Sequence, residues 1–222
     1  MTTADDSTAA ADIVDPADSV HTLLWRWADH VDRDGEKGMT RPEWFAPAGE
    51  LTLADEITWF GMGSGGWYHG DLPSGLEKAP VYAGYHWVRP DDGPPVARAS
   101  MVVVPMADPA RIMAAEWNDG YEGYEPAAVD GYAVLCSSAF DPTSIPGRDA
   151  EADLREAKRI IATGDEQGRR ANHAEIVTDP ERAGNALFFP VEDGERDGYE
   201  ALEDDGTVVC VAFIGFDFPL GV

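Results

Sequence analysis

The chain has 222 residues, of which 44% are hydrophobic, and its 42 acidic and 16 basic residues give a formal net charge of −26. This length suits one large domain with a sizeable core, and the composition is not that of a disordered chain. A surface with this much negative charge repels phosphate backbones and anionic lipid. We therefore expect neither nucleic acid nor a membrane as a partner.

The positive charges are mostly arginine, because the only lysines are Lys37, Lys78 and Lys158. Two sources fit this balance: a bacterium with a GC-rich genome, or a salt-adapted cytosol in which a carboxylate-rich surface stays hydrated. We favour the GC-rich bacterium, because Trp and Phe are not depleted.

Both cysteines, Cys136 and Cys210, lie in apolar runs and are predicted to be small buried hydrophobes. The absence of a CxxC pair or a disulfide framework fits a reducing compartment. The first residues lack the basic and apolar regions of a signal peptide, and no stretch approaches the ~18–20 apolar residues of a membrane span. We therefore expect a cytoplasmic protein.

The N-terminal part is predicted to be separate from the main domain. Residues 1–16 read as a disordered acidic leader, and residues 17–35 carry apolar side chains at helical spacing that end near Gly35. We expect the stripe that contains Leu24 and Trp27 to pack on the main domain, with docking of a partner as the alternative.

Residues 48–222 are predicted to form a single β-rich domain. The expected strands are 51–60, 80–88, 95–105, 129–136, 185–191, 199–203 and 207–216, each rich in apolar or aromatic residues and bounded by turn residues. The last of these carries no charge until Asp217, which is typical of a strand covered on both faces. Two short helices interrupt the strands. One has Asp108 as N-cap with Ile112 and Met113 facing inward, and the other covers 149–164.

The strands outnumber the helices, and no regular strand–helix alternation runs through the chain. The fold class is therefore α+β, with a mainly antiparallel sheet, an N-terminal amphipathic helix and two short helices.

The stretch GMGSGGWYHG at 61–70 has the glycine spacing of a dinucleotide-binding loop. Such a loop must open a helix, and Gly70, Pro73 and Gly75 follow too closely for one to begin. Ser64 is not expected to be a nucleophile, because the first glycine of a nucleophile elbow is Met62 here. The stretch is predicted to be a turn between strands.

The remaining residues with chemical potential are His69, His86, Asp130 and Asp141. A divalent metal would use His69, Asp71 and His86, with Asp130 or Asp141 as a further ligand. No ligand motif supports that site, and His86 lies among Tyr82, Tyr85 and Trp87, so the sequence predicts a structural histidine and no bound metal or other cofactor. The aspartates at strand ends read as turn or backbone caps.

Three patches resemble a bacterial family, the domain of unknown function 4241 family, in the same order along the chain. They are LPSG at 72–75, VDGYAVLCSSAFD at 129–141 and DGYEALEDDGTVVCVAFIGFDF at 197–218. On this resemblance, which covers roughly residues 50–222, the positions that match are Asp130, Asp141, Asp205, Gly206 and Asp217. Ser74 stands where the family has Thr, and Arg196 where it has Gly. The family brings no established activity.

We expect a cytoplasmic, non-catalytic binding domain for a basic protein partner, as an immunity or regulatory protein is. Its candidate binding residues are Trp59, Trp67 and Tyr68. The alternative is a hydrolase that uses Asp130, Asp141, His69 and His86, with or without a metal. A third option is a metabolic accessory or structural subunit. The sequence does not indicate a substrate or an oligomeric state.

Overall fold

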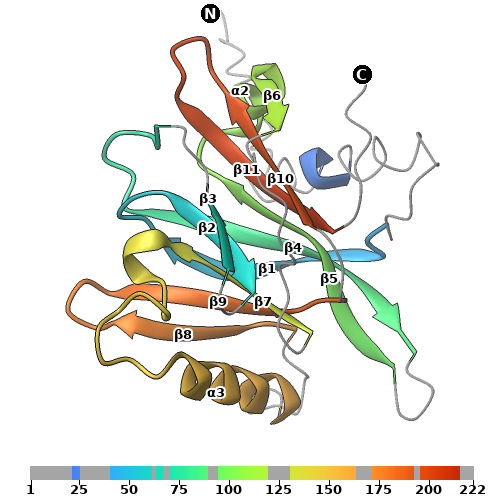
Figure 1. Cartoon of the computed structure of the whole chain (residues 1–222). Coiled ribbons are helices and arrows are strands. Elements are labelled where there is room, and N and C mark those ends of the chain that lie inside the picture. Colours follow the sequence, from blue (N-terminus) through green and yellow to red (C-terminus); the bar gives the residue numbers. More distant parts are fainter. Residues whose placement is uncertain are drawn as a thin grey trace, which may run out of the picture.

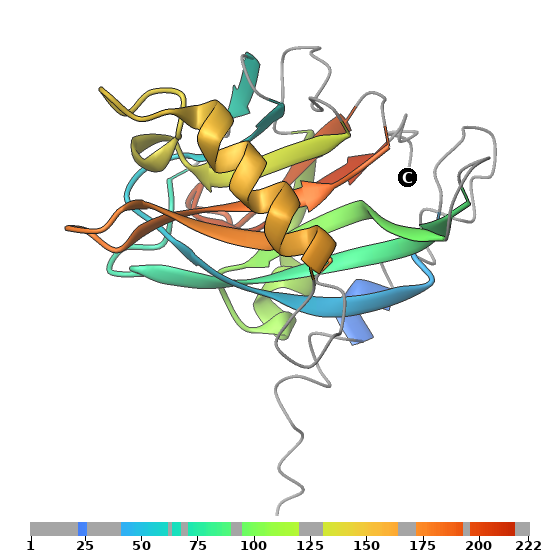
Figure 2. The same cartoon turned by 90° about the horizontal axis from the view of Figure 1, so that it is seen from below.

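The computed structural model describes residues 22–25, 41–61, 64–67, 71–89, 95–119, 131–163, 172–192 and 196–215. Within these residues, two antiparallel sheets pack face to face, with short helices on their outer faces (Figures 1 and 2). The α+β class with a mainly antiparallel sheet, predicted from the sequence, is confirmed.

The larger sheet has six strands and contains the most apolar part of the chain. The strand that runs from Val208 lies between two others and buries Val211 and Phe213 on one face and Val209 and Ala212 on the other. The prediction of a strand covered on both faces is therefore confirmed for its described residues. In spatial order the strands are β1 (Trp44–Thr52), β4 (Lys78–Val88), β5 (Val96–Pro105), β11 (Val208–Gly215), β10 (Arg196–Leu202) and β6 (Glu116–Asp119).

The smaller sheet has five strands, and part of the glycine-rich stretch lies in it. Gly61 pairs with Ser64 across two antiparallel strands, so the described part of this stretch opens no helix, as predicted, but it forms a strand rather than only a turn. In spatial order the strands are β3 (Ser64–Trp67), β2 (Ile57–Gly61), β7 (Tyr132–Ser137), β9 (Gly184–Pro190) and β8 (Ala174–Asp179).

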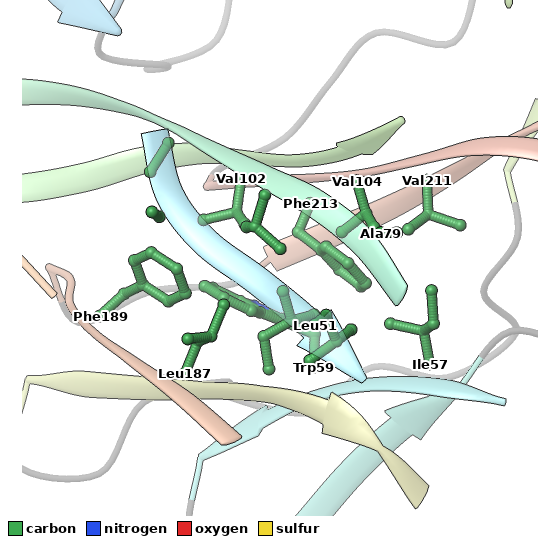
Figure 3. Close-up of a cluster of buried hydrophobic side chains, with 14 of the residues drawn as sticks. Leu51, Ile57, Trp59, Ala79, Val102, Val104, Leu187, Phe189, Val211 and Phe213 are labelled. Carbon is green, nitrogen blue, oxygen red and sulfur yellow. The ribbon is translucent and has the colours of Figure 1, made fainter. Parts of the chain in front are cut away.

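The main core lies between the two sheets. Figure 3 shows Val102, Val211 and Phe213 of the larger sheet facing Trp59 and Phe189 of the smaller one. The ring centroids of Trp59 and Phe213 are 5.3 Å apart, and those of Trp59 and Phe189 are 5.8 Å apart. Removing this apolar surface from water, at about 25 cal/mol per Å², is what holds the sheets together.

Asn185 of β9 provides a polar link between the sheets. Its side chain is 3% exposed, and its amide oxygen accepts a hydrogen bond from the Thr52 backbone at 2.9 Å. Its amide nitrogen donates to the Glu50 carbonyl and to the Glu175 carboxylate, both at 2.8 Å. One buried side chain therefore satisfies polar groups of β1 and β8 as well as its own.

Helices cover the outer faces of both sheets (Figure 2). Leu154 and Ala157 of α3 (Ala150–Thr163) are buried against the smaller sheet. A helical turn at residues 22–25 buries Leu24 on the outer face of the larger sheet, beside Ile112 of α2 (Pro109–Ala114). Core packing of the predicted N-terminal helix is therefore confirmed for Leu24, while Trp27 lies outside the described residues.

Four features differ from the sequence prediction. The expected strand 51–60 is divided, because residues 53–56 turn the chain from β1 in one sheet to β2 in the other. β1 begins at Trp44, before the predicted boundary at residue 48. β3, β6 and β8 were not predicted as strands, and β3 lies within the glycine-rich stretch that was predicted to be a turn. Met113 is 51% exposed rather than buried, because α2 is short and only Ile112 faces the sheet.

In the described parts of the chain, no helix is both long enough and apolar enough to cross a membrane.

Candidate functional site

The two-sheet body has one end at which loops from both sheets meet. Asp71 forms a parallel bridge with Thr207, and the Val208 amide donates to the Asp71 carbonyl at 2.9 Å. The turn at 53–56 lies at the same end, since Leu53 donates to the Glu77 carbonyl and Ala139 donates to the Asp55 carboxylate. Segments far apart in sequence therefore form one surface.

This end is rich in exposed carboxylates. Those that define it are Asp55, Glu56, Asp71, Asp204 and Asp205, and we call it the acidic end. It also contains three parts of the motifs that resemble the family above. They are the LPSG turn at 72–75, Asp141 just after the 3-10 helix η1 (Ser138–Phe140), and the turn that contains Asp205 and Gly206.

One surface pocket at the acidic end combines carboxylates with an apolar wall. Its volume is about 490 Å³, and its rim carries Asp55, Glu56 and Asp71. Leu72 and Leu76, which pack against the main core, line it beside Pro73. None of these three carboxylates is paired with a cation in the described part of the structure. The pocket therefore fits a positively charged group on an aliphatic stem.

A second pocket, of about 650 Å³, is lined by Arg111 and by residues 202–205, which precede Thr207 of the bridge. Its arginine is already occupied: Nε of Arg111 donates to Glu203 at 2.8 Å. This hydrogen bond raises the pKa of Arg111 and lowers the pKa of Glu203. Glu116, Asp204 and Asp205 also line the pocket, so it keeps an excess of negative charge.

The pairing of Arg111 is part of a general pattern. Several cations of the described residues form ion pairs within the chain, and because acids outnumber bases, the carboxylates left over carry the net charge. The pairs are Lys78–Glu50, Arg111–Glu203, Arg148–Asp153, Arg155–Asp149, Arg155–Glu151, Arg159–Glu156 and Arg182–Asp179.

The opposite end of the body holds His86, which is 4% exposed. Its Nε2 lies 2.9 Å from a carboxylate oxygen of Glu192, and its buried Nδ1 has no hydrogen-bond partner. The sequence predicted that Tyr82, Tyr85 and Trp87 would hold this ring, but the interaction that fixes it is with a carboxylate that follows β9.

Of the four predicted catalytic residues, the structure describes Asp141 and His86, and it does not bring these two together. Asp141 lies just after the end of β7. Glu192, the partner of His86, lies near the start of β7, because the amide of the preceding Val191 donates a hydrogen bond to the carbonyl of Gly131. The length of β7 therefore separates them, about 17 Å at about 3.3 Å per residue.

The Asp141 carboxylate is also occupied, since it accepts hydrogen bonds from Thr143 and Ser144 at 2.7–2.9 Å. This is the turn cap that the sequence predicted for it. Asp71 lies at the acidic end, away from His86, and His69 and Asp130 lie outside the described residues. Among the residues that the structure places, no group of three or more His, Cys, Asp and Glu side chains is arranged to hold a metal ion.

The predicted binding aromatics also need a correction. Trp59 is 6% exposed and belongs to the main core, because strand alternation turns it inward between Phe189 and Phe213. Trp67 pairs with Thr58 through its backbone, while its side chain and the whole of Tyr68 lie outside the described residues. Among the tryptophan side chains that the structure describes, the exposed one is instead Trp87, at 50%.

Both cysteines are fully buried, as predicted. Burial raises the pKa of the Cys136 thiol well above its usual value, with smaller contributions from Asp141 and Asp55, and raises the pKa of Cys210 as well. A protonated, enclosed thiol is a poor nucleophile, so neither cysteine is placed for catalysis.

Comparison of the chain with protein-family models, with curated proteins and with solved structures finds no match. The resemblance to the family named above stays a prediction.

Proposed function

We propose that the protein is a cytoplasmic, non-catalytic binding module whose acidic end takes a basic protein partner, as an immunity or regulatory protein does. The observation that carries this proposal is the pocket rimmed by Asp55, Glu56 and Asp71, which has an apolar wall and no paired cation among the described residues. A net charge of −26 adds long-range attraction for a basic protein and speeds its encounter.

The pocket suits a lysine or arginine side chain for a physical reason. The aliphatic stem of such a side chain can lie on Leu72, Pro73 and Leu76 while its charged head meets the rim carboxylates. Each exposed ion pair contributes only about 0.2–1 kcal/mol, so binding depends on several pairs formed together. The turn at 204–206 adds the exposed carboxylates of Asp204 and Asp205 to the same end of the molecule.

A hexa-arginine peptide tests the proposal. Calorimetry should detect binding to the full chain, and the variant Asp55→Asn/Glu56→Gln/Asp71→Asn should bind about ten-fold more weakly, because three ion pairs of about 0.5 kcal/mol each are lost. The matched control is Glu151→Gln/Glu156→Gln/Glu181→Gln, which removes the same charge from α3 and the turn before β9. Equal losses in the two variants would contradict a defined site.

The second candidate is the hydrolase, and the observation that favours it is the His86–Glu192 pair. A histidine paired with a carboxylate is an arrangement that catalytic sites use to orient the imidazole. Hydrolysis of 4-nitrophenyl acetate above the buffer rate, lost in His86→Ala, would support it. So would stoichiometric zinc or manganese that is lost in His69→Ala/His86→Ala. A wild-type rate equal to that of buffer would argue against it.

A further inference from the structure

Two tryptophans form an aromatic surface at the end of the body opposite the acidic end. The ring of Trp87 on β4 is 50% exposed, and its centroid lies 5.0 Å from that of the half-buried Trp44 on β1. Beneath them, Tyr85 is fully buried and stacks on Trp44 at 5.7 Å. The exposed ring therefore rests on a packed aromatic base and is held in place without being covered.

Elsewhere the chain covers aromatic faces with its own cations. Arg41 lies 5.4 Å from the ring centroid of Trp25, Lys158 lies 5.4 Å from that of Tyr132, and Arg182 lies 4.8 Å from that of Phe140. Within the described segments, no cation of the chain lies over Trp87 in the same way. Trp87 is thus an aromatic face that is open to a cation from outside.

A carboxylate lies beside the backbone of this residue. Oε1 of the exposed Glu43 accepts a hydrogen bond from the Trp87 backbone amide at 3.2 Å, and Glu43 is itself held by a bond from its amide to the Tyr85 carbonyl at 2.7 Å. A guanidinium is suited to such a neighbourhood, because it can stack on an indole ring and donate hydrogen bonds to a carboxylate.

We propose that Trp87, supported by Trp44 and flanked by Glu43, is a contact surface for an arginine side chain of a basic protein partner. This inference rests on the proposed function and adds a second contact to it. β4 begins near the acidic end and ends at Trp87, and its eleven residues span about 33 Å, so the two contacts are separate. A second copy of the chain is a poor occupant, because two molecules that each carry −26 repel one another.

The test follows the Trp87 indole resonance by NMR while hexa-arginine is added to the full chain, with the resonance assigned from Trp87→Phe. The Trp87 signal should shift, and Trp87→Leu should weaken binding about two- to five-fold, the size of an exposed cation–π contact. Glu43→Gln should weaken it about two-fold. Val177→Ala is the matched control, because Val177 is a comparably exposed apolar residue at 54% on another strand, and it should leave the affinity unchanged.

The outcomes separate this inference from the proposed function. Hexa-arginine could bind with an affinity that falls in the variants of the acidic end but does not change in Trp87→Leu. In that case the aromatic contact is wrong and the proposed function stands. If the wild-type chain does not bind hexa-arginine at all, both fail. A Trp87 shift that instead follows protein concentration in the absence of peptide would show that a second copy covers the ring and would overturn the inference.

Discussion

Ala183 is the last residue of the turn between β8 and β9, and Gly184 is the first residue of β9. Ala183 has a φ of 54°, in the left-handed region that disfavours a Cβ atom. Its carbonyl accepts a hydrogen bond from the Thr52 hydroxyl at 2.8 Å, which fixes the turn against β1. At Gly184, an added Cβ would lie 2.2 Å from the ring of the buried Phe140.

This turn gives a paired prediction. Ala183→Gly should raise the free energy of unfolding by about 1 kcal/mol, because glycine removes the left-handed strain. Gly184→Ala should lower it by about 2 kcal/mol through the clash with Phe140, and the double variant Gly184→Ala/Phe140→Leu should recover part of the loss. Urea unfolding measures all three. A Gly184→Ala protein as stable as wild type would contradict the packing of Phe140 described above.

The two buried cysteine thiols also predict how the free energy of unfolding depends on pH. Burial raises the pKa of the Cys136 and Cys210 thiols in the folded protein, whereas in the unfolded chain thiols ionise near pH 8.5. Above that pH only the unfolded state releases these protons, so the free energy of unfolding should fall as pH rises, by about 1.4 kcal/mol per pH unit for each ionised thiol.

Urea unfolding at pH 8 and pH 9.5 measures this slope, and Cys136→Ala/Cys210→Ala is the control that should flatten it. Tyr85, whose pKa is also raised by burial, adds its own decline only above about pH 10. If the wild type and the double variant lost stability equally between these pH values, the thiols would not be the cause.

At the scale of elements, Asn185 joins the two sheets and should matter more than a typical polar residue. Asn185→Ala leaves the Thr52 amide and the Glu50 carbonyl without their partner, which should cost about 3 kcal/mol. Asn172, a half-buried loop residue, is the control, and Asn172→Ala should change stability by less than about 0.5 kcal/mol. Thermal unfolding of the two variants decides whether the link is structural.

The elements that could be predicted from the sequence are those with strong local signals. The cap of α2 at Asp108 is confirmed, since its carboxylate accepts bonds from Ala110 and Arg111, and α3 and β11 lie where their patterns placed them. β8 was missed because its stability is not local. It is an edge strand, and Arg148 ties its Val177 and Thr178 carbonyls to Asp153 of α3.

The candidate site was less predictable, because it depends on pairings between distant segments. Nothing local indicates that Asp71 meets Thr207, or that the turn at 53–56 meets η1. Strand alternation also places Trp87 on the same side of β4 as the buried Tyr85, so the pattern favoured burial for both. Burial instead depends on whether the second sheet reaches that far, which only the packed structure shows.

At the scale of the whole molecule, the charge of −26 predicts how stability responds to salt. Screening should relieve self-repulsion between dilute buffer and 1 M KCl. Because several described cations are already paired and we favour a bacterium with a GC-rich genome, we expect the melting temperature to rise by less than about 4 °C, which corresponds to about 1 kcal/mol. A much larger rise, by differential scanning calorimetry, would indicate a salt-adapted protein.

The central claim, that the acidic end takes a basic partner, is tested most directly by finding which carboxylates touch a bound cation. Carbodiimide coupling joins a lysine amine to a carboxylate in contact with it, and mass spectrometry identifies the residue. With hexa-lysine as the probe, cross-links should concentrate on Asp55, Glu56 and Asp71, rather than on Glu151 of α3, whose carboxylate is 86% exposed. Cross-links that follow exposure alone, with Glu151 foremost, would contradict the claim.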